Sequence, residues 1–311
     1  MNKKKPLGQR FKNNLVCAGA NVAYSLAQKL PRKTGTALFG LIGAATFLFP
    51  DREKKRTLDH LEFIYGKEWD KKQIKQCARN VYVQLGKNLF DSIYLAKLSR
   101  SDFDKIVMHD PLDSFTQAYN KGKGVIVITA HTGCFEMLLH FFAIHGFKSF
   151  AIGRKMFDPR LEKLVRKKRS GINIDYMDKS ENTRKIIRFL NEGKTFGVLI
   201  DQDTNVEGIF APFLNHPAHT PSGPVKIAMK MGIPVFVSTT LRQPDSSHYV
   251  YLNELELVNS GDFESDLFEN VKKANDLICN TITRCPNQWV WMHRRWRRKA
   301  APEKSVPDLK K

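Results

Sequence analysis

From residue 124 onward, short apolar runs alternate with amphipathic helical patterns, and this alternation constrains the fold more than any other feature of the sequence. The runs carry the Val, Ile and Phe residues typical of strands, and they occupy 124–129, 148–153, 173–177, 195–200, 233–241 and 249–257. The helical patterns occupy 134–145, 158–169, 181–192 and 222–231. Strands that alternate with helices form βαβ units. The sequence therefore predicts an α/β fold whose mostly parallel sheet is flanked by helices.

The first hundred residues are predicted to be helical and to precede this α/β body. Within 70–98, apolar residues recur at spacings of three and four, as on one face of a helix: Ile74, Cys77, Ala78, Val81, Leu85, Leu89, Ile93 and Ala96. The segment 286–296, with the sequence PNQWVWMHRRW, is a candidate closing strand. We therefore expect an N-terminal helical region at 1–100, an α/β domain at 101–300 and a tail at 301–311.

An apolar stretch near the N-terminus suggests contact with a membrane surface. Residues 35–49 are apolar, but 15 residues are too few to span a bilayer, which takes about 20. Basic sequences flank the stretch on both sides, KLPRK before it and DREKKR after it. These features favour an element that lies in the interface beside anionic headgroups. The alternative is a buried helical hairpin of a soluble domain.

Net charge indicates which classes of partner the protein attracts, and cysteine usage indicates its redox compartment. With 51 Lys and Arg against 31 Asp and Glu, the formal charge is +20, which predicts attraction to polyanions: nucleic acid, an anionic bilayer, or an acidic protein or substrate. The five cysteines are scattered, odd in number and form no C-x-x-C pair. That usage is typical of a reducing compartment, and it argues against a zinc site or a disulfide framework.

The end of the first predicted strand carries the most informative pair of residues. His131 and Glu136 would lie about 140° apart on one helix, so they meet only if His131 is in the strand-end loop and Glu136 in the first turn of the next helix. Gly133 permits such a tight turn. A carboxylate on one ring nitrogen would fix the imidazole tautomer and leave the other nitrogen to take a proton from a substrate hydroxyl. Alternatively, His131 is a structural polar residue and Glu136 merely suits the helix dipole. Cys134 is a rival nucleophile, but no lysine or arginine lies beside it in the sequence.

Other candidates lie at neighbouring strand ends, where α/β folds bind their ligands. Arg154 follows the second strand and is either an anion contact or a surface cation. Asp201 and Asp203 form a DQD motif without a third ligand at metal spacing, so we expect them to cap amides or pair with Arg154 or Arg169.

The segments downstream of these strand ends have open interpretations. The sequence GIFAPFL and the turn around Thr220 and Gly223 are expected to form a loop before the next helix. Phe210 and Phe213 either line an acyl tunnel or pack in the core. The ending HRRWRRK is expected to be a solvated basic tail, with Trp289, Trp291 and Trp296 suited to the headgroup zone of a membrane.

Several of these sequences occur in one order along the chain: ITAHTGCFEML, IGRKMFDPRLEKLVRKKR, GVLIDQD, GIFAPFLNHPAHTPSGPVKIAMKMGIPV and QWVWMHRRWRRK. From about residue 15 to 298 the chain resembles the bacterial lipid A biosynthesis acyltransferases, the late acyltransferases within the lysophospholipid acyltransferase-like superfamily. The H-x-x-x-x-E block belongs to the wider superfamily. The DQD motif, the APF…TPSGP run and the W-x-W-x-H-R-R-W ending are more specific to this branch.

The resemblance implies an α/β sandwich behind a membrane-associated helical region at the cytoplasmic face of a bacterial inner membrane. It implies transfer of a fatty acyl chain from a thioester, on acyl carrier protein or on coenzyme A, to a hydroxyl of a phosphorylated glycolipid such as a lipid A precursor. His131 matches the catalytic histidine, Glu136 its acidic partner, and Arg154 a basic position that meets acceptor phosphate. The candidate substrate-binding residues are Arg154, Arg169, Asp201, Asp203, Phe210, Phe213 and Thr220. No metal or other cofactor is expected.

Alternative functions remain open on the sequence alone. A phosphatidylinositol mannoside or lysophospholipid acyltransferase that uses acyl-CoA would share the same motifs. A lipid-ester hydrolase could use the histidine on water, although the chain has no G-x-S-x-G elbow. An inactive scaffold is disfavoured because His131 and Glu136 are both present. A nucleic-acid-binding protein fits the charge, but no helix-turn-helix, RRM or zinc-finger pattern accompanies it.

Overall fold

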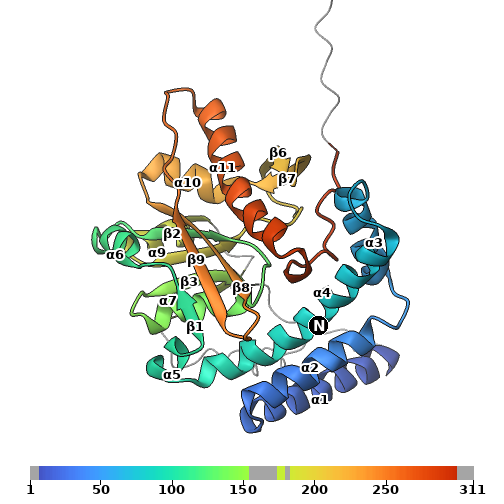
Figure 1. The fold of residues 1–311 in the computed structure, drawn as a ribbon. Coiled ribbons are helices and arrows are strands. Elements are labelled where there is room, and N and C mark those ends of the chain that lie inside the picture. Colours follow the sequence, from blue (N-terminus) through green and yellow to red (C-terminus); the bar gives the residue numbers. More distant parts are fainter. Residues whose placement is uncertain (1–6, 154–173, 179–182, 300–311) are drawn as a thin grey trace, which may run out of the picture.

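The computed structural model describes residues 7–153, 174–178 and 183–299, and within these ranges the α/β prediction is confirmed (Figure 1). The helices are α1 (Leu7–Lys29), α2 (Arg32–Thr46), α3 (Arg52–Tyr65), α4 (Lys71–Tyr94), α5 (Arg100–Asp104), α6 (Asp113–Asn120), α7 (Leu138–Ile144), α9 (Thr183–Asn191), α10 (Gly223–Met231) and α11 (Phe263–Arg284). Short 3₁₀ helices are η1 (Leu95–Lys97), η2 (Phe135–Met137) and η3 (Pro286–Gln288). The helix expected at 158–169 falls outside the described residues.

A seven-stranded sheet forms the centre of the molecule, in the order β1-β9-β8-β2-β5-β3-β4. Its strands are β1 (Val107–His109), β2 (Val125–Thr129), β3 (Ser149–Gly153), β4 (Ile174–Asp178), β5 (Thr195–Leu199), β8 (Val235–Arg242) and β9 (His248–Glu254). Neighbours pair in parallel except β8 with β9, which are antiparallel. The carboxyl ends of β2, β3, β4, β5 and β8 therefore lie at one edge of the sheet.

Two expectations about the chain after β5 are wrong. The segment expected to be a loop forms a two-stranded antiparallel hairpin of β6 (Gly208–Phe213) and β7 (His216–Pro221). The candidate closing strand at 286–296 instead contains η3 followed by turns, with only one isolated bridge, from Thr132 to Trp289. Its aromatic residues are buried by packing against side chains, so they do not need a place in the sheet.

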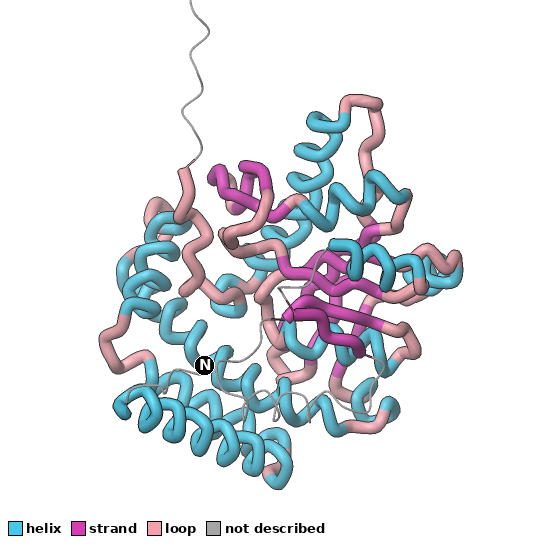
Figure 2. Tube along the Cα trace, turned by 180° about the vertical axis from the view of Figure 1, so that it is seen from behind, coloured by secondary structure: helices cyan, strands magenta, loops and turns pink. Residues whose placement is uncertain are grey.

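Both faces of the sheet are covered, because alternate residues of the central strand β2 enter different cores. Ile126 and Ile128 pack with residues of α10 and α11, whereas Val125 and Val127 pack with aromatic residues of α6 and α7. Side chains alternate between the faces of a strand, so a strand that is apolar at every position has both faces buried. Figure 2 shows the strands enclosed by helices, with the N-terminal helices at one end.

The N-terminal helices are tied to the sheet by a buried carboxylate. Asp91 of α4 is fully buried and accepts hydrogen bonds from Arg32 at the start of α2, from Arg242 at the end of β8 and from His248 of β9. Burial alone would raise the pKa of Asp91, but the hydrogen bonds from His248 and Arg32 and the charge of Arg242 lower it below the ordinary value. Asp91 is therefore an ionised link between the helical region and the sheet.

Candidate active site

The site is built where two paired strands end side by side. Strands β2 and β5 run parallel, with Thr129 opposite Leu199 at their ends. His131 and Asp201 each follow two residues later, so the pairing brings the two side chains to the same edge of the sheet. This is the edge at which open α/β sheets bind ligands.

The Asp201 carboxylate holds His131 by both its backbone and its ring. One oxygen, Oδ2, accepts from the His131 backbone N–H at 2.8 Å and from the Trp289 indole N–H at 2.8 Å. The other, Oδ1, lies 2.8 Å from Nδ1 of His131. With an ionised carboxylate on Nδ1, the ring carries its proton there and presents Nε2 as the basic nitrogen.

Asp201 remains ionised although it is fully buried. Burial alone would raise the pKa of its carboxyl group. The charge interaction with His131 and the hydrogen bonds from His131 and Trp289 outweigh burial, and the pKa falls below the ordinary value. A buried negative charge therefore stands behind the imidazole, where it can stabilise the ring after protonation.

Gln202 lies over the face of the His131 ring. Its amide nitrogen is 3.1 Å from Nδ1 and 2.9 Å from Nε2. An atom in the ring plane at both of these distances would overlap Cε1, so the amide nitrogen lies out of the plane. The Nε2 lone pair lies in the ring plane, so it points away from Gln202. The same amide lies 2.6 Å from Nε2 of His293, whose pKa is lowered to about 4, first by burial and then by His131. His293 is thus a neutral acceptor for Gln202 near neutral pH.

Gly133 lets the loop after His131 turn against the sheet. Its φ is +49°, a left-handed conformation that glycine adopts without strain. A Cβ at this position would overlap the carbonyl oxygen of Thr240 on β8. The Gly133 backbone is held by Gln288, whose carbonyl accepts its N–H, and by Asn88, whose amide donates to its carbonyl. The loop is therefore fixed by residues from α4, β8 and η3.

Glu136 lies in the first turn after the loop, as expected, within η2 (Phe135–Met137). Its side chain is exposed, and the carboxylate hydrogen-bonded to His131 Nδ1 is that of Asp201. The sequence pattern predicts Glu136 in this orienting position, but the structure places Asp201 there, and the role of Glu136 stays a prediction. Cys134 is buried, and its sulfur lies 3.7 Å from the Asn88 carbonyl oxygen.

Asp203 holds the C-terminal segment, residues 289–299, which carries Trp289 and His293 at the site. Its carboxylate accepts from the Arg298 backbone N–H at 2.9 Å and pairs with Arg297 at 3.3 Å. The expectation that the DQD aspartates cap backbone amides is therefore confirmed for both residues. The proposed partners Arg154 and Arg169 lie outside the described residues.

The remaining predicted substrate-binding residues, Phe210, Phe213 and Thr220, are buried or half-buried. Phe213 is fully buried beneath the Arg295 guanidinium and beside Trp289, whereas Phe210 is half-buried next to His219. The Thr220 hydroxyl accepts hydrogen bonds from Arg295 and Asn275. Their roles in substrate binding stay predictions.

The expectation that the tryptophans lie in a headgroup zone is wrong, and the expectation of a solvated basic ending holds for only part of it. Trp289, Trp291 and Trp296 are buried, and so is Arg295 in the middle of the basic run. Aromatic packing against the hairpin and α3 removes these side chains from solvent. Arg294 and Arg297 remain exposed.

Sequence reasoning missed Gln202, Trp289 and His293 as neighbours of His131. The DQD motif directly follows a strand, which is a signal of a ligand-binding edge, but the sequence does not tell which strand lies beside β2. Across the described residues, no group of three or more His, Cys, Asp or Glu side chains converges as metal ligands do.

Comparison with known proteins identifies the family of the chain. The family model described as bacterial lipid A biosynthesis acyltransferase matches residues 3–298. The chain belongs to this acyltransferase family. It is 24% identical over 267 residues to the lipid A biosynthesis palmitoleoyltransferase of Escherichia coli (strain K12), covering 85% of each chain. It has the same identity and coverage with the lipid A biosynthesis acyltransferase of Shigella flexneri.

For this acyltransferase we predict that Asp201→Asn costs more activity than Glu136→Gln. An asparagine would keep the backbone contact but would turn its NH₂ towards Nδ1, so the ring proton would move to Nε2 and remove the base. We expect kcat to fall by about 100- to 10,000-fold. Steady-state kinetics on both variants tests this, with circular dichroism as the check of folding. If Glu136→Gln instead lowers kcat by this factor and Asp201→Asn lowers it little, Glu136 is the orienting carboxylate.

Proposed function

We propose that this protein transfers a fatty acyl chain from a thioester to a hydroxyl of a lipid A precursor, with His131 as the general base. The observation that carries this proposal is the Asp201–His131 pair at the ligand-binding edge of the sheet, in a chain of the lipid A acyltransferase family. The relatives named above, which act in lipid A biosynthesis, support the acceptor class.

In the proposed mechanism, Nε2 of His131 takes the proton of the acceptor hydroxyl as its oxygen attacks the thioester carbonyl. Asp201 stabilises the imidazolium that forms, because an ionised carboxylate already lies against Nδ1. The carbon–sulfur bond then breaks, the departing thiolate receives the proton from His131, and the ester remains. A general base of this kind contributes about 100- to 10,000-fold in rate.

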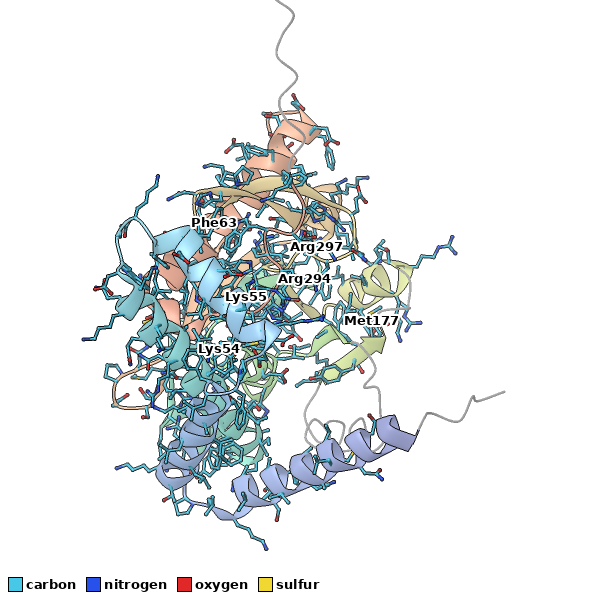
Figure 3. All side chains as sticks on the ribbon, turned by 90° about the vertical axis from the view of Figure 1, so that its right-hand side faces the viewer. Lys54, Lys55, Phe63, Met177, Arg294 and Arg297 are labelled. Carbon is cyan, nitrogen blue, oxygen red and sulfur yellow. The ribbon has the colours of Figure 1, made fainter. Side chains whose placement is uncertain are left out.

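A basic surface beside the site favours an acidic acyl carrier protein as the donor. Lys55 on α3 and Arg294 and Arg297 in the C-terminal segment are exposed, and Figure 3 shows these side chains gathered on one side of the molecule. Exposed charges of one sign speed the association of an oppositely charged protein. The basic run at 163–169 lies outside the described residues.

An apolar surface on the N-terminal helices favours binding to the cytoplasmic face of a membrane. One side of α2 packs on α4 through Phe39, while the opposite side and the turns after it expose large apolar residues: Leu38, Leu41, Ile42, Leu48 and Phe49. Helix α1 exposes Leu15, Val16 and Val22. None of the helices in the described ranges combines the length and apolarity needed to cross a bilayer. An amphipathic surface flanked by Lys29 and Lys33 suits an anionic interface.

The proposed reaction predicts that thiol release from an acyl thioester requires the acceptor lipid. Purified protein is incubated with the thioester, with and without lipid A precursor, and the lipid product is measured by mass spectrometry. His131→Ala should reduce transfer by about 100- to 10,000-fold while the protein stays folded. Thiol release without acceptor would instead identify a hydrolase, and full turnover by His131→Ala would refute the base.

The proposed donor predicts a difference between carrier-protein and CoA thioesters. We expect kcat/KM with the carrier-protein donor to fall more steeply as salt rises, because steering charges are screened over about 8–10 Å near physiological ionic strength. Lys55→Glu with Arg294→Glu should weaken the carrier-protein reaction selectively. The matched control, Lys121→Glu with Lys123→Glu, reverses two charges just before β2, at the opposite edge of the sheet. Equal salt slopes for both donors would contradict the donor assignment.

The proposed membrane surface predicts that Leu41→Glu with Leu48→Glu weakens binding to vesicles that contain anionic lipid. Burying an apolar side chain in the interface contributes about 1.5–3 kcal/mol, so the pair should reduce binding by at least about tenfold. Vesicle co-sedimentation measures the effect. Met108→Glu with Val206→Glu is the control, because both residues are exposed but lie outside α1 and α2. Equal losses of vesicle binding in the two double variants would show that the membrane-binding surface is not on α1 and α2.

A further inference from the structure

A cavity lies between α4, the turn that joins β8 to β9, and the end of α11. Its volume is about 490 Å³, within the range that small-molecule sites occupy. Three cationic residues, Lys87, Arg242 and Arg284, line it, and its lining includes no Asp or Glu. Amides and hydroxyls make up much of the remaining wall, among them Asn287, Ser246 and Tyr251.

The positive charge at this cavity exceeds the negative charge that supports it. Asp91 is shared between Arg32 and Arg242, and Arg32 also interacts with the exposed carboxylate of Asp245 in the turn after β8, so these four charges balance. His248 adds no charge at neutral pH, because burial lowers its pKa to about 4. Lys87 adds one positive charge in excess, and Arg284, exposed and placed over the Tyr251 ring, adds a second. In the part of the chain that the structure describes, neither Lys87 nor Arg284 has an ion-pair partner.

The surroundings of Lys87 disfavour its charged form. Its pKa is lowered, first by burial and then by the charge of Arg242, with Asp91 only partly compensating. Lys87 and Arg242 are like charges that lie partly buried near each other, which is unfavourable, so a bound anion would stabilise Lys87 in its charged form. A concave wall of three cations and several hydrogen-bond donors suits a doubly charged anion, because a phosphate monoester carries about −1.5 to −2 at neutral pH.

We propose that this cavity binds the phosphate monoester of a glycosyl headgroup. Lys87 and Arg284 would hold the phosphate, while Arg242 contributes its charge from behind, because its guanidinium already donates to Gln84, Asp91 and Asn88. The Tyr251 ring with the amides of Asn287 and Gln84 would face the sugar. The cavity is larger than inorganic phosphate requires, which favours a phosphate attached to a polar ring. The assignment of the sugar rests on the proposed glycolipid acceptor. The same chemistry could be supplied by the headgroup of that acceptor or by a free glycosyl phosphate.

The cavity is connected to the loop that carries His131. The Arg242 guanidinium donates to the Asn88 side chain, and the Asn88 amide donates to the carbonyl of Gly133. Gln288 lines the cavity and accepts the Gly133 N–H through its carbonyl, while the next residue, Trp289, holds Asp201. A headgroup bound here would lie against the residues that fix the loop, so it would help to position the acceptor for the base.

The test measures binding of glucosamine 1-phosphate, inorganic phosphate and glucosamine to the full-length protein by isothermal titration calorimetry. We expect glucosamine 1-phosphate to bind most tightly, and glucosamine without phosphate not to bind. Lys87→Gln with Arg284→Gln should weaken binding of glucosamine 1-phosphate by at least about tenfold, because two charge-assisted contacts are lost. The matched control, Lys71→Gln with Lys72→Gln, removes two exposed charges at the start of α4 and should change binding by less than about twofold.

Two further measurements distinguish ligand binding at the cavity from the proposed acyl transfer. Binding is measured without turnover, so His131→Ala should bind glucosamine 1-phosphate as tightly as the unmodified protein even if the proposed transfer is absent. A raised KM for the acceptor in Lys87→Gln with Arg284→Gln would identify the acceptor headgroup as the source, and an unchanged KM would identify a free glycosyl phosphate. The proposal is overturned if the unmodified protein does not bind glucosamine 1-phosphate, if inorganic phosphate binds as tightly, or if both double variants bind equally.

Discussion

The Asp201 carboxylate is the interaction on which the rest of the site depends. It is buried, yet three donors satisfy it: the His131 backbone, the His131 ring and the Trp289 indole. A buried charge without such partners would be costly by several kcal/mol, so the carboxylate, the loop and the C-terminal segment must assemble together. The same contacts that make the charge tolerable also set the imidazole tautomer. Stability and chemistry at this site therefore have one physical cause.

A second buried carboxylate, Asp91, performs the corresponding task for the helical region. Through Arg32, Arg242 and His248 it joins α2 and α4 to the end of the sheet next to the site. The helices that expose apolar residues are thereby placed in a fixed relation to His131. If those helices lie on a membrane, as proposed, a lipid hydroxyl and the catalytic base would be held at one end of the same sheet. The cationic cavity beside Asp91 lies along this connection.

Much of the fold could be predicted from the sequence, because local patterns determine it. The strand-like runs lie within a few residues of β2, β3, β4, β5, β8 and β9, and the spacing of apolar residues in 70–98 matches α4 and η1. The errors are at two segments, one with a local partner and one with remote packing partners. The GIFAPFL run pairs with residues just after it to form a hairpin, and the tryptophans of 286–296 are buried by packing rather than by strand pairing.

The sequence by itself determined that a histidine follows an apolar strand, that a DQD motif follows another, and that motifs of one acyltransferase family lie in order. These follow from residue type and spacing along the chain. Only the tertiary structure decided which carboxylate meets the histidine. Glu136 is five residues away, and Asp201 is 70 residues away. Asp201 reaches the ring because β5 is the strand that pairs with β2, and strand order is set by packing over the whole sheet rather than by local sequence.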